Sequence, residues 1–148
     1  MIRVQEQPFD VGAELSALSA GRRDIGAVAS FVGLVRDLAG APIAAMTLEH
    51  YPGMTEKKLA EIEAEAKARW SLQASLIVHR YGRMLPGEPI VLVATASEHR
   101  AAALESCAFL IDWLKPEAPV WKLEESSGET RWVEARATDE AAAARWQR

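Results

Sequence analysis

The segment SEHRAAALESCAFLIDWLKPEAPVWK, residues 97–122, decides how the rest of the chain is organised. Its apolar side chains recur at the period of one face of an α-helix, every three or four residues, as at Leu104, Cys107, Ala108, Ile111 and Leu114. Proline lacks the N–H group that another helical turn needs, so Pro116 is expected to end this helix. The pattern predicts one helix, packed along most of its length.

Polar residues gather at both ends of this predicted helix. Ser97 is the expected N-cap, His99 and Arg100 lie in the first turn, and Lys115 lies in the last turn, with Lys122 seven residues further on. Such a grouping suggests an anion site. His99 and Lys115 are sixteen residues apart in the sequence, or about 24 Å along a helix axis. A compact site that uses both ends therefore requires two chains, and a two-fold homodimer supplies them.

Composition limits the classes of function. The 148 residues, 49% hydrophobic and 26% charged, are typical of one globular domain spanning 1–148. A net charge of −4 disfavours a general nucleic-acid binder. Residues 1–20 lack the apolar core of a signal peptide, and no apolar run approaches the roughly 20 residues that span a membrane. We expect a cytoplasmic protein without membrane contact.

Cysteine and histidine usage disfavours a metal centre. Cys107 is the only cysteine, so an intramolecular disulfide or a cysteine-based zinc site is excluded, and its place on the apolar stripe predicts a small buried side chain. His50, His79 and His99 show no spacing typical of metal ligands. We expect neither a metal nor a cofactor.

The remaining elements follow from periodicity and turn signals. Strands are expected at 2–6, 25–32, 44–50, 74–81, 89–96, 120–125 and 130–135, and helices at 11–20, at 55–70 with Thr55 as N-cap, and after Asp139 as N-cap. The run 89–96 is almost wholly apolar, which predicts a central strand. The charged residues of helix 55–70, Glu63 among them, are expected to be solvated.

Strands in pairs between helices favour an α+β domain with mostly antiparallel sheet. Strands 25–32 and 44–50 are expected to form one hairpin, and strands 120–125 and 130–135 another. No glycine-rich phosphate loop follows a strand, which disfavours a nucleotide-binding fold.

Lys115 is the residue best placed for chemistry. A lysine at a helix end often only complements the helix dipole, contributing about 0.3–1 kcal/mol. Here Trp113, Pro119 and Lys122 provide rigid apolar and basic neighbours in the sequence. In a dry basic pocket, desolvation and a nearby cation lower a lysine pKa more than the dipole raises it, and such a lysine is reactive. The residues alone indicate a basic pocket for a phosphorylated ligand, with Arg36, Arg131 and Arg136 as further candidates.

Four motifs together resemble the large, catalytic subunits of molybdopterin synthase, the MoaE family. They are TLEHYPGMTEKKL (Thr47 to Leu59), the Ser97–Arg100 SxHR, LKPEAPVWK (Leu114 to Lys122) and RWVEAR (Arg131 to Arg136). The resemblance runs from about Gln7 to Trp146. It implies an α/β-hammerhead fold and an enzyme that converts cyclic pyranopterin monophosphate to molybdopterin by installing the two dithiolene sulfurs.

The resemblance also implies partners. The sulfur would arrive as a thiocarboxylate on the C-terminal Gly-Gly tail of a small ubiquitin-like subunit. Two such subunits would flank a homodimer of this chain in a heterotetramer. A sulfur-adding enzyme with only one, core-placed cysteine fits a sulfur donor from outside.

The family's functional residues fall on particular positions here. Its essential lysines match Lys115, as nucleophile or general base, and Lys122, which would stabilise developing negative charge. His99 and Arg100 would hold the substrate from the neighbouring protomer. The other matching or adjoining substrate-binding positions are Arg36, Phe31, Leu34, Val35, Leu123, Glu124 and Arg136.

One position departs from the family pattern. The family often has Gly-Lys-Val-Arg where this chain has Gly33-Leu34-Val35-Arg36. Losing that lysine removes an anion contact, so weaker binding is expected rather than lost chemistry. Two alternatives to the enzyme stay open: a non-catalytic dimeric adaptor that keeps the partner groove, and a small-anion-binding protein. Retention of Lys115 and Lys122 favours the enzyme, because an adaptor has no need of them.

Overall fold

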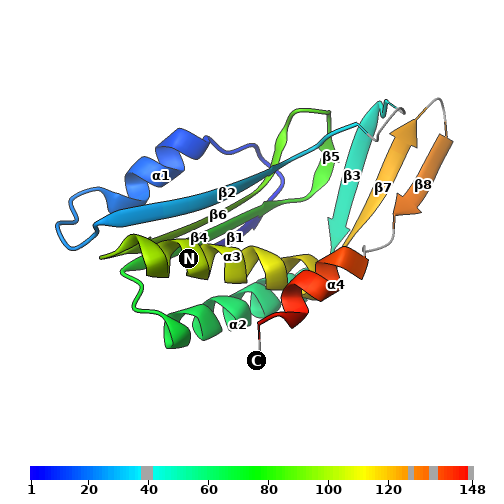
Figure 1. The fold of residues 1–148 in the computed structure, drawn as a ribbon. Coiled ribbons are helices and arrows are strands. Elements are labelled where there is room, and N and C mark those ends of the chain that lie inside the picture. The colour runs from blue at the N-terminus through cyan, green and yellow to red at the C-terminus, as the bar shows by residue number, and fades with distance from the viewer. Residues whose placement is uncertain (38–41, 127–128, 134–136, 147–148) are drawn as a thin grey trace.

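Two four-stranded sheets and four helices build the molecule (Figure 1). The computed structural model describes residues 1–37, 42–126, 129–133 and 137–146. The strands are β1 (Ile2–Gln5), β2 (Ala27–Leu34), β3 (Ala45–His50), β4 (Ala74–Arg80), β5 (Gly82–Met84), β6 (Pro89–Ser97), β7 (Val120–Ser126) and β8 (Glu129–Val133). The helices are α1 (Val11–Ser19), α2 (Met54–Arg69), α3 (Arg100–Glu117) and α4 (Ala137–Ala144).

The first sheet has the order β1-β4-β6-β2 and helices on both faces. Its strand β6 is central, as its apolar run predicts, and is antiparallel to both β4 and β2. Side chains alternate between the two faces of a strand. In β4, Ile77 therefore packs with α2 and α3, while Leu76 and Val78 pack with α1. Helices thus cover both faces of the sheet. Two of its three strand pairs are antiparallel and only β1 with β4 is parallel, which confirms the predicted α+β class with mostly antiparallel sheet.

The second sheet, of order β5-β3-β7-β8, is wholly antiparallel and has its own small core. Val35, Ile43, Met46, Leu48 and Met84 form this core. Figure 1 shows the sheet at one end of the molecule, beyond the C-terminal end of α3. The predicted hairpin of β7 and β8 is confirmed. The layout agrees with the expected hammerhead arrangement.

Strand pairing differs from the sequence expectation in two places. β2 and β3 do not form a hairpin, because β2 pairs with β6 in the first sheet while β3 pairs with β5 and β7 in the second. Consecutive strands can belong to different sheets when the segment between them is long enough to cross over. β5 is not among the strands that the sequence predicts, since three residues that include a glycine carry no alternating pattern.

Both ends of α3 also differ from expectation. The helix continues through Pro116 to Glu117, because the Ala118 N–H still bonds to the Leu114 carbonyl at 3.0 Å and closes the last turn. His99 is the N-cap, without a side-chain cap bond. Ser97 instead ends β6, and its hydroxyl donates to the Ser71 carbonyl. The N-cap of α3 is thus two residues later than the expected Ser97, whereas in α2 the N-cap, Gly53, is two residues earlier than the expected Thr55.

The buried face of α3 is rotated slightly from the predicted stripe. Leu104 is 61% exposed, whereas Phe109 and Leu110 are fully buried among the side chains of α2 and the first sheet. Cys107 is buried as predicted, and burial raises the pKa of its thiol to about 11. A thiol with such a pKa is inert at neutral pH.

Glu63 is buried rather than solvated, which corrects the expectation for α2. Its carboxylate accepts hydrogen bonds from the Met1 ammonium and the Ser75 hydroxyl, both at 2.6 Å. Burial raises the pKa of Glu63, but these bonds outweigh it, so that its pKa lies below the ordinary value. The Met1 ammonium, which is 62 positions away in the sequence, thus helps to stabilise the buried Glu63 carboxylate.

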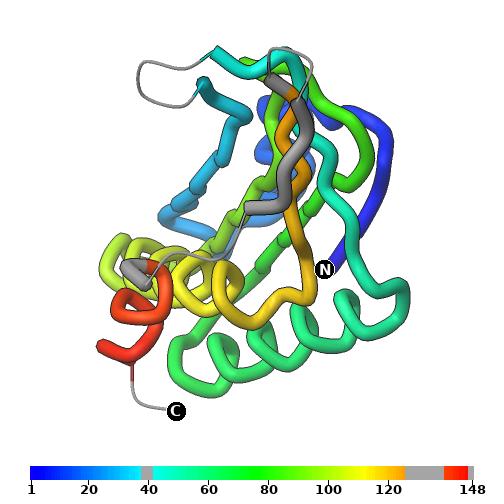
Figure 2. Tube along the Cα trace, turned by 90° about the vertical axis from the view of Figure 1, so that its right-hand side faces the viewer, coloured from blue at the N-terminus to red at the C-terminus, as the bar shows by residue number. Residues whose placement is uncertain are grey.

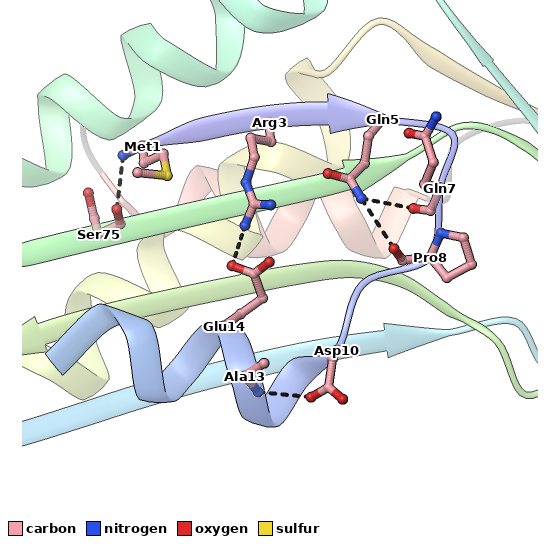
Figure 3. A network of polar contacts seen from close by, with 9 residues as sticks. All are labelled: Met1, Arg3, Gln5, Gln7, Pro8, Asp10, Ala13, Glu14 and Ser75. Carbon is pink, nitrogen blue, oxygen red and sulfur yellow. Dashed lines mark hydrogen bonds and ion pairs between the residues drawn. The ribbon is translucent and has the colours of Figure 1, made fainter. Parts of the chain in front are cut away.

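The first strand and α1 are joined by local polar contacts (Figure 3). The Met1 ammonium also donates to the Ser75 carbonyl, and Arg3 pairs with Glu14 of α1. Asp10 caps α1 by accepting from the Ala13 N–H at 2.8 Å. The Met1 contact thus joins the start of the chain to β4, and the Arg3–Glu14 pair joins α1 to β1.

α4 lies beside α3 in both views (Figures 1 and 2). Asp112 of α3 accepts hydrogen bonds from Arg145 at 2.5 Å and from the Trp146 indole at 2.7 Å. No helix in the described part of the chain is long and apolar enough to cross a membrane.

Candidate functional site

A cleft of about 290 Å³ opens where the two sheets meet the C-terminal end of α3. Its polar lining comes from five elements or their ends: Arg36, His79, Lys115, Lys122, Glu124 and Asp139. A second hollow of about 350 Å³ lies on α3 and α4, around Leu104 and Trp146. It contains one acidic and one basic residue, so the concentrated charge marks the first cleft as the candidate site.

Each cation reaches the cleft from a different part of the chain. Arg36 follows the end of β2, Lys115 lies in the last turn of α3, and Lys122 is on β7. Lys122 and Glu124 are two residues apart on one strand and therefore share a face. They pair with Leu48 and Met46 of β3, which also line the cleft. The fold thus brings three basic side chains into one cleft, although the first and the last, Arg36 and Lys122, are 86 positions apart in the sequence.

The charges of the cleft favour an anion. Among the described residues, three cationic side chains line the cleft with two carboxylates, of which Glu124 is buried and Asp139 is half-buried. Lys122 is half-buried, whereas Lys115 and Arg36 are exposed. The dry surroundings expected for Lys115 are therefore not provided by the single chain, because the end of α3 faces solvent.

His79 is a functional candidate that the sequence reading missed. It lies on β4, is only 6% exposed, and lines the cleft. Its Nδ1 is 2.9 Å from the Arg80 carbonyl, and because a carbonyl only accepts, Nδ1 carries the hydrogen. The only signal in the sequence was a histidine within the apolar strand ASLIVHR, which a buried structural histidine also produces.

The ring of His79 is uncharged at neutral pH. Burial is the main cause that lowers the pKa of His79, to about 4. The positive charges of Lys115, then His50 and Lys122, act in the same direction, while the bond to the Arg80 carbonyl opposes them. A second proton is thus disfavoured both by the lost hydration and by the neighbouring cations.

Only some of the other residues predicted to bind substrate line the cleft. Leu34 and Val35 line the cleft, whereas Phe31 and Leu123 are not among its lining residues. Leu123 alternates with Lys122 and Glu124 and so lies on the other face of β7. Arg136 lies outside the described residues, as do the side-chain surroundings of Arg131.

His99 and Arg100 are exposed at the opposite end of α3 from Lys115. At 1.5 Å per residue the helix separates the two ends by about 24 Å, so one chain does not bring them into one small site. Among the residues that the structure describes, no three histidine, cysteine, aspartate or glutamate side chains are grouped as metal ligands.

Comparison with known proteins gives a consistent result. The family model described as MoaE protein matches residues 4–117. The molybdopterin synthase catalytic subunit of Ralstonia nicotianae is 57% identical over 146 residues, which cover 98% of this chain and 83% of the relative. That of Pseudomonas aeruginosa is 55% identical over 147 residues, covering 99% and 98%.

A solved structure gives the same result at the level of the fold. The molybdopterin biosynthesis MoaE protein from Burkholderia ambifaria superposes with a TM-score of 0.85 at 55% identity, covering 99% of this chain and 97% of that one.

Proposed function

The chain belongs to the MoaE protein family, and from this premise we propose that it is the catalytic subunit of a molybdopterin synthase. It transfers sulfur from the thiocarboxylated C-terminus of a small ubiquitin-like subunit to cyclic pyranopterin monophosphate. The observation that carries the proposal is the convergence of Arg36, Lys115 and Lys122 in one cleft. These three cations suit a ligand with a phosphate and a donor with a thiocarboxylate, which are both anions.

The proposed roles follow from position and charge. Lys115 lines the cleft and is exposed, so that a polypeptide tail has access to it, and it acts as nucleophile or general base. Lys122 is half-buried, where a cation stabilises developing negative charge more strongly than in bulk water. Arg36 binds the phosphate or carboxylate. The entering tail displaces water around Lys115, which supplies the desolvation that the isolated chain lacks.

The proposed active form is a homodimer whose two copies share each site. β2 is an edge strand of the first sheet and exposes Val28, Phe31 and Leu34 by 42%, 36% and 53%. No charged side chain occurs from Ala27 to Leu34, although exposed edges are usually protected by charges or proline. A second copy of this strand is therefore a suitable occupant.

A two-fold axis at this edge also gives a role to His99 and Arg100, which lie far from Lys115 within one chain. The Ala27 end of β2 lies opposite Ser97, just before His99 and Arg100, and the Leu34 end leads to Arg36. Antiparallel pairing of two β2 strands brings the Ala27 end of one copy beside the Leu34 end of the other. His99 and Arg100 of one protomer thereby complete the cleft of its partner. With one small subunit per cleft, the assembly is a heterotetramer; its cytoplasmic location stays a prediction.

Reconstitution tests the proposal. The purified chain is combined with thiocarboxylated small subunit and cyclic pyranopterin monophosphate, and the dithiolene product is measured. Product from the wild type, and none from Lys115→Ala with unchanged small-subunit binding, supports the enzyme. Partner binding without product from the wild type indicates the adaptor. Binding of the phosphorylated ligand without partner or product indicates a small-anion-binding protein.

The shared site has a separate test. A Lys115→Ala chain and a chain carrying both His99→Ala and Arg100→Ala are each inactive as homodimers under the proposal. Mixing and reassembling them restores one intact site per heterodimer, so up to about a quarter of wild-type activity returns with random pairing in equal amounts. Activity that stays absent in verified heterodimers contradicts the shared site.

A further inference from the structure

His79 is placed in the candidate cleft, yet the proposed chemistry assigns it no task. It lies at the junction of β4 with the second sheet, and its side chain has little access except to the cleft. The three cationic residues around the cleft can only donate hydrogen bonds. A ligand that also carries N–H or O–H groups needs acceptors, and a carboxylate or a neutral imidazole provides them.

A hydrogen bond to the backbone fixes the orientation of the His79 ring. Nδ1 donates to the Arg80 carbonyl at 2.9 Å. Arg80 is itself buried, and its guanidinium donates through Nε and Nη2 to the Glu6 carbonyl at 3.0 and 2.9 Å. This arrangement ties the residue after His79 to the segment that follows β1. With Nδ1 occupied, Nε2 is the nitrogen left for a ligand, and in a neutral ring it carries a lone pair.

We propose that Nε2 of His79 is a hydrogen-bond acceptor at the base of the cleft for an N–H or O–H group of the bound ligand. The anionic part of the same ligand is neutralised by Arg36, Lys115 and Lys122. The inference rests on the proposed function, in which the donor is an N–H group of the reduced pterin ring. His79 is thus a substrate-binding residue that recognises the pterin rather than the phosphate.

The surroundings keep this acceptor available over a wide range of pH. Lys115 from α3, His50 from β3 and Lys122 from β7 act on the pKa of His79 by their charge, and each disfavours a proton on Nε2. Arg36, Glu124 and Asp139 are the other charged residues described in the cleft lining. A histidine exposed to water would gain that proton near pH 6.5 and become a donor. Burial, together with these neighbouring positive charges, therefore preserves an acceptor that exposure to solvent would remove.

Kinetics with three proteins test the inference: the wild type, His79→Leu and His79→Gln. Loss of one neutral hydrogen bond raises the KM for cyclic pyranopterin monophosphate by roughly three- to tenfold in His79→Leu, with kcat nearly unchanged. The carbonyl of glutamine also accepts, so His79→Gln regains most of the affinity.

A purely structural role predicts a different pattern. It lowers the melting temperature and kcat without a selective rise in KM, and glutamine does not restore binding. An unchanged KM in folded His79→Leu overturns the inference, as does a KM for His79→Gln that equals that of His79→Leu.

A second measurement needs no variant. In the wild type labelled with ¹⁵N-histidine, Nε2 of His79 gives an unprotonated, neutral signal, and adding cyclic pyranopterin monophosphate shifts it in the direction of a hydrogen-bonded nitrogen. An Nε2 signal that stays unchanged while ³¹P signals report binding overturns the inference and leaves the proposed function intact. A wild type that neither binds nor converts this compound overturns both.

Discussion

Acidification should destabilise this protein through His79, and the size of the effect follows from its surroundings. The imidazole takes up a proton near pH 6.5 in the unfolded chain, whereas its pKa in the folded chain is about 4. Between these values the unfolded state binds one more proton than the folded state, so the free energy of unfolding falls as the pH falls. From pH 7 to pH 4 the loss amounts to about 3 kcal/mol.

The assay is urea unfolding at pH 7, 6, 5 and 4, followed by tryptophan fluorescence, for the wild type and His79→Gln. Glutamine has no titrating group, so the difference between the two stability curves isolates the histidine. The pKa of Glu63 is lowered, and its contribution is lost as the pH falls below about 4.5, but both proteins share it and it cancels in the difference.

We expect the wild type to lose about 3 kcal/mol more than His79→Gln over this range, mostly between pH 6.5 and pH 4. Two parallel curves refute the reasoning, because they mean that His79 has the same pKa in the folded and unfolded chains. Equal slopes against urea at each pH check that both proteins unfold in the same two-state manner.

Four further predictions concern the site and the core. Lys115→Ala should lower product formation at least about 100-fold while small-subunit binding, measured by calorimetry, stays unchanged; a loss of less than about tenfold contradicts its proposed role. Leu34→Lys should lower the KM for cyclic pyranopterin monophosphate, since it adds a cation to the cleft lining, and a raised KM would show that the apolar side chain is needed there. Phe109→Ala should lower the free energy of unfolding in urea by about 3–5 kcal/mol, because the ring is fully buried, with Phe109→Leu as the milder control. Asp112→Ala removes the acceptor that holds Arg145, so amide exchange in α4 should quicken roughly tenfold while β6 is unaffected; unchanged exchange in α4 would mean that apolar contacts alone hold it.

The sequence determined most elements and the polar residues at the two ends of α3. The apolar run of β6 predicted a central strand, and the helical period predicted α3, because both patterns record which faces of a local element are buried. The motif around Lys115 and Lys122 and the strand-to-loop position of Arg36 indicated the residues that the fold then brings into one cleft.

Only the tertiary structure decided which strands pair and which polar groups lie inside. β2 and β3 are adjacent in sequence and each resembles half of a hairpin, but their partners are β6 and β7, whose choice depends on contacts far along the chain. Glu63 reads as a surface charge until Met1 and Ser75 supply its hydrogen bonds. His79 reads as an ordinary strand residue until the second sheet and α3 place a cleft beside it. Periodicity in a sequence records local burial, whereas strand pairing and the environment of a polar group are set by residues that only folding brings near.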